Sequence, residues 1–279
     1  MAGPGKPCTT LARAAPKRLS EALFDGRLLV FEDLPPVRRL AERARAILAG
    51  VFATDDPCTA EDRLSAPAFR RLALRARKVI GEDETIERHW HDTLSTIGYL
   101  PADTWLDRIR LRAVPSRDDI DHQRLQVLPP HRDTWGSGIA AQVNWWLPLY
   151  PLSDTRTMLL WPAAFRHPVA NDSADWSFDA FRRGGSADYP LLPVARESPP
   201  APALPVSIAP GQLLAFSAAH LHGGVSDGSG VTRFGIDTRT VWDPDRRAGR
   251  GAPNVDCAAG TEMWRWYSPP QGAGAGERQ

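Results

Sequence analysis

Apolar residues recur at two different spacings along this chain, and the spacing changes near residue 105. Before that point, residues 37–52 (VRRLAERARAILAGVF) and 66–80 (APAFRRLALRARKVI) carry apolar side chains three and four positions apart among arginines. Such spacing places the apolar side chains on one face of a helix. We therefore predict that residues 21–100 are largely helical.

After residue 105 the apolar runs are short, rich in β-branched and aromatic residues, and separated by proline and glycine, which is typical of strands. These runs lie at 105–114, 140–150, 155–162, 204–210, 212–222 and 232–241, and a short helix is predicted at 175–183 within a polar segment, 170–200. Strands in succession favour an antiparallel sandwich or barrel over βαβ units. The prediction is an α+β fold with a jelly-roll core over 105–242 and helices packed outside it.

The composition changes this picture little. With 279 residues, 42% hydrophobic and 24% charged, the chain is an ordinary globular protein. We predict one domain over residues 21–267, between a disordered leader at 1–20 and a disordered tail at 268–279. The chain has no apolar run long enough for a membrane span and no secretory signal pattern, so we expect no membrane partner.

Charge and cysteine content narrow the expected setting and partners. Acidic residues are interleaved with the arginines, the formal net charge is +1, and no basic stripe suited to nucleic acid stands out. Three widely spaced cysteines argue against a disulfide framework and favour a reducing, cytoplasmic setting. We expect a small-molecule partner and no nucleic acid; the sequence does not indicate the oligomeric state.

Four of the seven histidines are not expected to bind a metal. His89 and His91, in the sequence ERHWHD, lie in a helical stretch, where positions two apart point about 200° apart around the axis and cannot bind one ion. His122 and His167 are single histidines in loop-like sequence. We interpret all four as surface residues.

A histidine and an aspartate two positions apart, His131 and Asp133, are the stronger candidates. In extended backbone their side chains project to the same face and can bind adjacent positions of one metal ion. The later segment 215–237 offers a third ligand, His220 or His222, and then Arg233. Two imidazoles and one carboxylate form the facial triad of non-heme Fe(II) oxygenases. A guanidinium such as that of Arg233 is suited to bidentate binding of a carboxylate.

The chain contains the pattern His131-x-Asp133, His222 and Arg233, with PGQLLAF (210–216) before the second histidine and HGG (222–224) from it onward. This pattern resembles that of the Fe(II)/2-oxoglutarate-dependent dioxygenases. The similarity is to the branch of phytanoyl-CoA hydroxylase and ectoine hydroxylase, over residues 105–242. It implies a double-stranded β-helix (cupin-like) core and Fe(II) held by His131, Asp133 and His222. It also implies 2-oxoglutarate bound to the iron and to Arg233, and hydroxylation of a C–H bond with O2, releasing succinate and CO2.

The chain departs from this branch in two places. Members often carry a serine two residues after the second histidine, where this chain has Gly224, and a P-G-S-H turn where it has WPAAFRH (161–167). Because of these departures, the sequence does not identify the residue that pairs with Arg233 or the residues that bind the substrate.

The choice between the two later histidines depends on spacing. His222 lies eleven residues before Arg233, as in the family, and His220 thirteen. Two glycines follow His222 and allow the backbone to turn away from a crowded site. We predict His222 as the ligand and place His220 one strand step deeper, either behind the metal ligands or facing the substrate. Arg239, on the same strand face as Arg233, is the competing residue for the co-substrate.

Further site residues follow from strand alternation. In AAQVNWWLPL, Gln142, Asn144 and Trp146 share a face, and Gln142 and Asn144 are predicted to bind the co-substrate. Candidate substrate-binding residues are Trp135, Trp146, Arg112 and His220. Arg110 and Arg112 share a face that either meets an anionic substrate or is solvated. We expect a small or medium polar metabolite.

Three other classes remain open from the sequence. A non-oxidative cupin-type isomerase could use the same three ligands but has no need of Arg233. A dinuclear hydrolase would need more ligands than the sequence offers. A jelly-roll binding protein without catalysis would need no metal ligands at all.

Overall fold

The computed structural model describes residues 8–11, 15–183, 190–199 and 202–271, and every structural statement below concerns these ranges. Outside these ranges lie parts of the predicted leader, parts of the 170–200 segment and most of the predicted tail. Within them, none of the helices combines the length and the apolar character needed to cross a membrane.

The N-terminal third is helical, as the periodicity predicts. Its helices are α1 (Pro16–Phe24), α2 (Pro35–Phe52), α3 (Ala60–Arg63), α4 (Ala66–Gly81) and α5 (Glu84–Ile97). Prolines occupy the first turns of α2 and α4, where a missing N–H is harmless. The Asp83 side chain accepts from the backbone N–H of Ile86 and caps α5, which ends at Gly98 with a φ of 117°.

Most of the remaining chain forms strands. They are β1 (Cys8–Leu11), β2 (Leu28–Phe31), β3 (Thr104–Asp107), β4 (Arg110–Val114), β5 (Gln142–Pro148), β6 (Met158–Leu160), β7 (Leu204–Pro205), β8 (Leu213–Ser217), β9 (His222–Gly224), β10 (Arg233–Trp242) and β11 (Tyr267–Ser268). Short helices follow some of them: α6 (Asp133–Ser137), α7 (Phe178–Arg182) and α8 (Asp243–Arg247), with 3-10 turns at Pro57–Thr59, Pro101–Asp103, Pro162–Ala164 and Trp264–Trp266.

The strands form two sheets. The larger has the order β1-β2-β8-β5-β10-β3-β11, with β4 also paired to β10, and the smaller has the order β7-β6-β9. All described pairs are antiparallel except β1 with β2. The predicted mixture of helices and antiparallel strands is therefore present, while the double-stranded β-helix topology stays a prediction.

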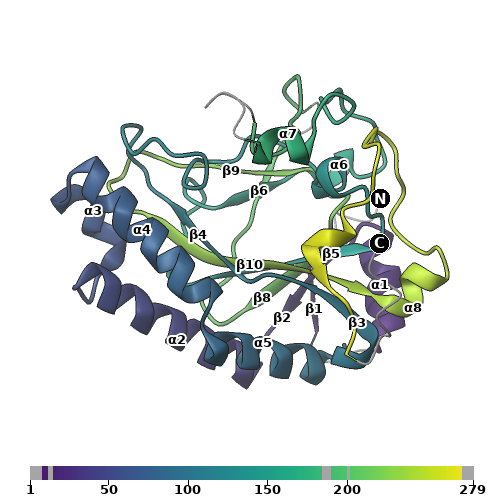
Figure 1. Ribbon diagram of the computed structural model, residues 1–279, viewed down its shortest axis with the longest axis horizontal. Helices are drawn as coiled ribbons and strands as arrows, with labels where there is room; N and C mark the ends of the chain where they lie inside the picture. Colours follow the sequence, from purple (N-terminus) through teal and green to yellow (C-terminus); the bar gives the residue numbers. More distant parts are fainter. Residues whose placement is uncertain (1–7, 12–14, 184–189, 200–201, 272–279) are drawn as a thin grey trace, which may run out of the picture.

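The large sheet separates two apolar layers. Val143, Trp145 and Leu147 of β5 pack into one core with α2, α4 and α5. Trp146, on the other face of the same strand, packs with Leu160 of the small sheet in a second core. In Figure 1 the long helices accordingly lie along one side of the large sheet, and β6, β9, α6 and α7 along the other. The space between the two sheets holds the candidate site.

Part of the predicted disordered leader is ordered. Residues 8–11 form β1, which pairs in parallel with β2 at the edge of the large sheet. Helix α1 begins at Pro16 and buries Leu19 and Leu23 in the main core. These two leucines, four positions apart, give the segment the apolar face that holds it against the fold.

Candidate metal centre

His131, Asp133 and His222 converge on one point. Each offers a ligand atom, and these atoms lie within 4.8 Å of one another. His131 and His222 stand opposite each other in an isolated antiparallel bridge and exchange two backbone hydrogen bonds, of 2.8 and 2.9 Å. Residues paired in this way present their side chains on the same face, and the two ring centroids are 4.1 Å apart.

The residue between the first two ligands fixes their direction. Arg132 is extended (φ −111°, ψ 138°), so His131 and Asp133, the first residue of α6, point to one side and Arg132 to the other. The buried Arg132 guanidinium pairs with Asp256 at 3.0 Å and also donates to the carbonyls of Ala219, Ala164 and His167. Arg132 therefore connects the segments around Ala164, Ala219 and Asp256 on the side of the chain opposite His131 and Asp133.

Backbone carbonyls orient both histidine rings. The Nδ1 atom of His131 donates to the Pro129 carbonyl at 2.7 Å, and that of His222 to the His220 carbonyl at 3.0 Å. Both rings are left with Nε2 as the metal-binding atom, since a carbonyl can only accept. Burial lowers the pKa of both histidines, that of His131 to about 3. They are thus neutral near pH 7, the form that binds a metal.

Two donors hold the Asp133 carboxylate. Asn144 donates to Oδ2 at 2.6 Å and Arg239 to Oδ1 at 3.0 Å, while Gln142 donates to the Asn144 side-chain oxygen at 2.8 Å. Burial alone would raise the pKa of Asp133, but the charge of Arg239 and the hydrogen bond from Asn144 help to outweigh it, and the pKa falls to about 2. The carboxylate is therefore ionised and oriented before any metal arrives.

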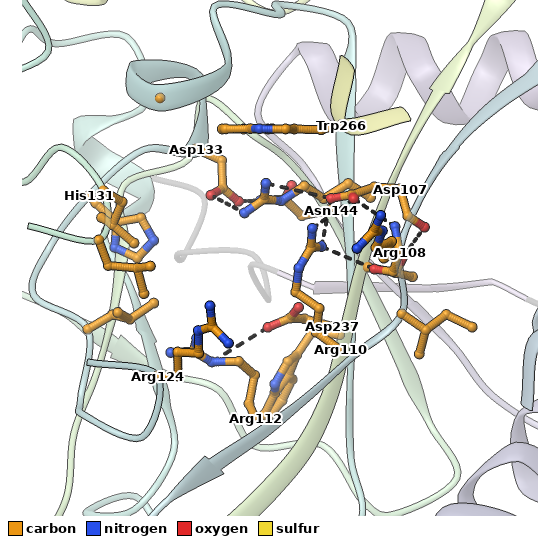
Figure 2. Close-up of a pocket in the computed structure, with 18 of the residues that line it drawn as sticks. Asp107, Arg108, Arg110, Arg112, Arg124, His131, Asp133, Asn144, Asp237 and Trp266 are labelled. Atoms are coloured by element: carbon orange, nitrogen blue, oxygen red, sulfur yellow. Dashed lines mark hydrogen bonds and ion pairs between the residues drawn. The ribbon is translucent and has the colours of Figure 1, made fainter. Parts of the chain in front are cut away.

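The ligand cluster opens into a cavity of about 950 Å³ between the two sheets. Figure 2 shows His131 and Asp133 on one wall, Trp266 on a second, and arginines of β4 on the far side. Arg112 and Trp146, two of the predicted substrate-binding residues, line this cavity. Figure 2 also shows Asn144 within it, next to Asp133.

Arg233 lies in the same cavity and has no carboxylate partner among the described residues. Its side chain is 8% exposed, its Nε atom has no acceptor, and its guanidinium lies 5.9 Å from the centroid of the Trp146 ring. A Cβ atom built on Gly224 would stand 3.5 Å from an Arg233 nitrogen, so the glycine leaves room beside the guanidinium. Burial, with the charge of Arg112, lowers the pKa of Arg233 to about 10.

Arg239, the competing arginine, is already engaged. It pairs with Asp133 at 3.0 Å and with Asp107 at 3.7 Å, and these carboxylates raise its pKa against the effect of burial. Of the two arginines, Arg233 is the one free to bind an external carboxylate.

Three predicted residues are placed differently from expectation. His220 does not line the cavity: its ring nitrogens face the carbonyls of Ser217 and Gly26, each at 3.1 Å, and its ring packs at a tilt against Phe165. It lies in a turn, because β8 ends at Ser217 and β9 begins at His222, so strand alternation does not extend to it. Trp135 is fully buried and donates to Asp256, away from the cavity.

Gln142, the third, lies behind Asn144 and does not line the cavity. Its one described side-chain hydrogen bond, to Asn144, supports the Asp133 carboxylate indirectly. The two helical histidines, His89 and His91, lie on α5 and do not line the cavity. Of the two loop histidines, His122 lines the cavity and His167 does not.

Sequence reasoning missed Asp256, which binds Arg132 and Trp135 at once. Nothing in its local sequence marks it, because these two partners are more than a hundred residues away. It also missed Arg77 and Arg124, which line the cavity from α4 and from the loop before α6.

Comparisons with known proteins give only distant matches. No protein-family model and no curated protein matches the chain. Among solved structures, apo ThoJ, a non-heme monooxygenase, matches at 16% identity and a TM-score of 0.43 over 74% of this chain and 70% of that one. SnoN, a non-heme alpha-ketoglutarate-dependent epimerase from nogalamycin biosynthesis, matches at 13% and 0.39 over 81% and 83%. EvdMO1 matches at 15% and 0.37 over 58% of this chain, which spans about a third (34%) of that protein. Similarity this distant assigns neither a family nor an activity, so the function has to be inferred from the site itself.

Proposed function

We propose that this protein is a non-heme Fe(II)/2-oxoglutarate-dependent oxygenase that hydroxylates an unactivated C–H bond of a small or medium polar metabolite. The proposal rests on two features that occur together in one cavity. Three ligands of the facial-triad type converge there, and a buried arginine without a carboxylate partner lies in the same space.

The described residues fit both groups. His131, Asp133 and His222 would hold Fe(II) through two Nε2 atoms and one carboxylate, a donor set typical of non-heme Fe(II) oxygenases. Arg233 would bind the carboxylate of 2-oxoglutarate remote from the metal. Bound iron and 2-oxoglutarate would supply O2 activation, with one oxygen atom entering the substrate and the other entering succinate as CO2 is released.

The protein's own part is to hold this geometry before the reactants bind. Backbone carbonyls fix the two imidazoles, and Asn144 and Arg239 fix both oxygens of the Asp133 carboxylate. Such preorganisation keeps the ligands from rearranging when the metal binds.

A non-oxidative isomerase on the same fold would use the same three ligands. It would gain nothing from Arg233, whose burial without a carboxylate destabilises the free protein. A non-catalytic binding protein would need neither feature. The free thiols of Cys58 and Cys257 are also in keeping with the cytoplasmic setting that we propose.

The test is an anaerobic titration of the full-length protein with Fe(II) and then 2-oxoglutarate, followed by the visible charge-transfer absorption of the iron chelate. We expect the band to saturate at one iron per chain and to be absent in His222→Ala. Succinate formation on admitting O2 provides the second readout. Absence of the band from wild-type protein that has bound iron would overturn the proposal.

A further inference from the structure

The cavity wall is strongly cationic. Of the described residues that line it, eleven are arginine or lysine and four are aspartate or glutamate. A low-dielectric wall of one sign raises the local concentration of ligands of the opposite sign. The question is which of these charges are already matched within the protein.

Several of the cations have partners. Arg110 pairs with Asp107 at 2.6 Å, Arg239 with Asp133, and Arg265 with Asp179 at 2.9 Å. Arg132 is matched by Asp256 behind the metal site. Lys78, on α4, and Glu82, the residue after its end, are both exposed and carry opposite charges, so together they add no net charge to the wall. Arg233 is assigned above to the co-substrate.

Arg108 and Arg182 are exposed and have no acidic partner among the described residues. The remaining cations are three guanidinium groups around one carboxylate. Arg112 lies 3.6 Å from Asp237, and the charges of Asp237, Arg112 and Arg124 all act on the half-buried Arg77. Arg77 donates to the Leu111 carbonyl, and Arg124 is exposed and has no acidic partner among the described residues. We call Arg77, Arg112, Arg124 and Asp237 the arginine cluster. It carries two positive charges more than Asp237 can neutralise.

The arginine cluster lies in the same cavity as the metal ligands but on a different wall. In Figure 2, Arg112, Arg124 and Asp237 gather on the side opposite Trp266, with His131 and Asp133 to one side. The Trp266 wall is aromatic, since Phe178 of α7 packs edge-on against Trp266 at 5.2 Å between centroids, and Phe181 also lines the cavity. A ligand that spans the cavity would thus meet cations at one end and aromatic rings at the other.

We propose that the arginine cluster binds a dianionic phosphate ester group of the substrate, whose carbon skeleton extends past the metal towards Trp266. The inference rests on the proposed function and names the chemical class of its substrate. A phosphate monoester carries close to two negative charges near pH 7, matching the surplus of the cluster, whereas one carboxylate would neutralise half of it. Guanidinium groups also match phosphate oxygens in geometry.

The test uses metal-free, full-length protein without 2-oxoglutarate, so that its outcome does not depend on iron chemistry. Phenyl phosphate, benzoate and phenol serve as probes in calorimetric titrations, because they share an aromatic ring and differ in charge. We expect phenyl phosphate to bind at least tenfold more tightly than phenol, and more tightly than benzoate. The variants Arg124→Ala and Arg77→Met should each weaken phenyl phosphate binding roughly fivefold, the size of a partly exposed ion pair.

Arg75→Ala is the matched control. Arg75 is an exposed arginine of α4, the helix that carries Arg77, and it does not line the cavity. It should leave the affinity for phenyl phosphate unchanged. Equal binding of benzoate and phenyl phosphate, or equal effects of Arg75→Ala and Arg124→Ala, would overturn the proposal. So would a loss of phenyl phosphate binding in Arg233→Met with none in Arg124→Ala, which would place the phosphate on the co-substrate's arginine. Each failure would leave the iron chelate band of the wild-type protein as a separate result.

Discussion

Replacing Arg233 by methionine is expected to stabilise the ligand-free protein while weakening its binding of 2-oxoglutarate. Methionine keeps an unbranched side chain at this position and removes the guanidinium, which lies 5.9 Å from the centroid of the Trp146 ring and whose Nε atom has no acceptor. A residue kept for packing or folding would show the opposite effect on stability. The combination of a more stable protein and a weaker site identifies a residue retained for binding.

The size of the stability change follows from the cost of burying the charge. The pKa of Arg233 falls from 12.5 to about 10, mainly through burial, and each pKa unit corresponds to about 1.4 kcal/mol. The charged side chain therefore destabilises the free protein by about 3 kcal/mol. For a chain of this size, recovering it would raise the Tm by on the order of 5 °C.

The change in affinity has the opposite sign. The 2-oxoglutarate carboxylate would lose its charge-assisted partner in a buried site, which typically costs about 2–5 kcal/mol. The dissociation constant of 2-oxoglutarate should rise by roughly thirtyfold or more. Iron binding should change little, because Arg233 does not contact His131, Asp133 or His222.

Two measurements check this prediction: scanning calorimetry of the metal-free protein, and titration of the iron-loaded protein with 2-oxoglutarate. Arg239→Met is the comparison variant. It removes the ion pairs to Asp133 and Asp107, so it should lower both the Tm and the iron affinity. The reasoning is refuted if Arg233→Met is less stable than wild type, or if Arg239→Met has the larger effect on 2-oxoglutarate binding at saturating iron.

Three further predictions concern single residues. Asp133→Ala should lose tight iron binding, and the wild-type protein should form no chlorinated product, because the carboxylate fills the position that a halogenase leaves open for chloride; mass spectrometry of the products checks this. His222→Ala should lose iron and succinate formation while His220→Ala keeps its iron, although at lower stability; the reverse result in iron content would reassign the ligand. Burial raises the pKa of the Cys58 thiol to about 12, so it should resist iodoacetamide at mildly alkaline pH until the protein is unfolded, and labelling in the native state would contradict that burial.

Local patterns, with the spacing that the resemblance implies, were enough to predict the cluster of His131, Asp133 and His222. His131 and Asp133 lie two apart on extended backbone, and alternation alone brings them to one face. His222 was chosen on its distance from Arg233 along the chain, and it joins them in the cluster. The same alternation failed at His220, because the strand ends before that residue, which a pattern of apolar and polar positions does not reveal.

Residues that depend on tertiary contacts were beyond the reach of the sequence. Strand alternation predicted that the Asn144 side chain points inward. It did not predict the hydrogen bond to Asp133, because that contact joins β5 to the start of α6. Arg77 is one of many helical arginines. Only the packing of α4 against β4 brings it beside Arg112.

The placement of Arg132 has a consequence for mutations far from the metal. Its guanidinium connects the ligand pair to Asp256, which also binds Trp135 and the backbone N–H of Val169. Any change that loosens the segment around Asp256 would therefore disturb the cluster of His131, Asp133 and His222 through the backbone of Arg132, which is not part of that cluster. If such a variant bound metal less tightly, the cause would be the weakened anchoring of Arg132 by Asp256. A mutational screen confined to His131, Asp133 and His222 would not detect it.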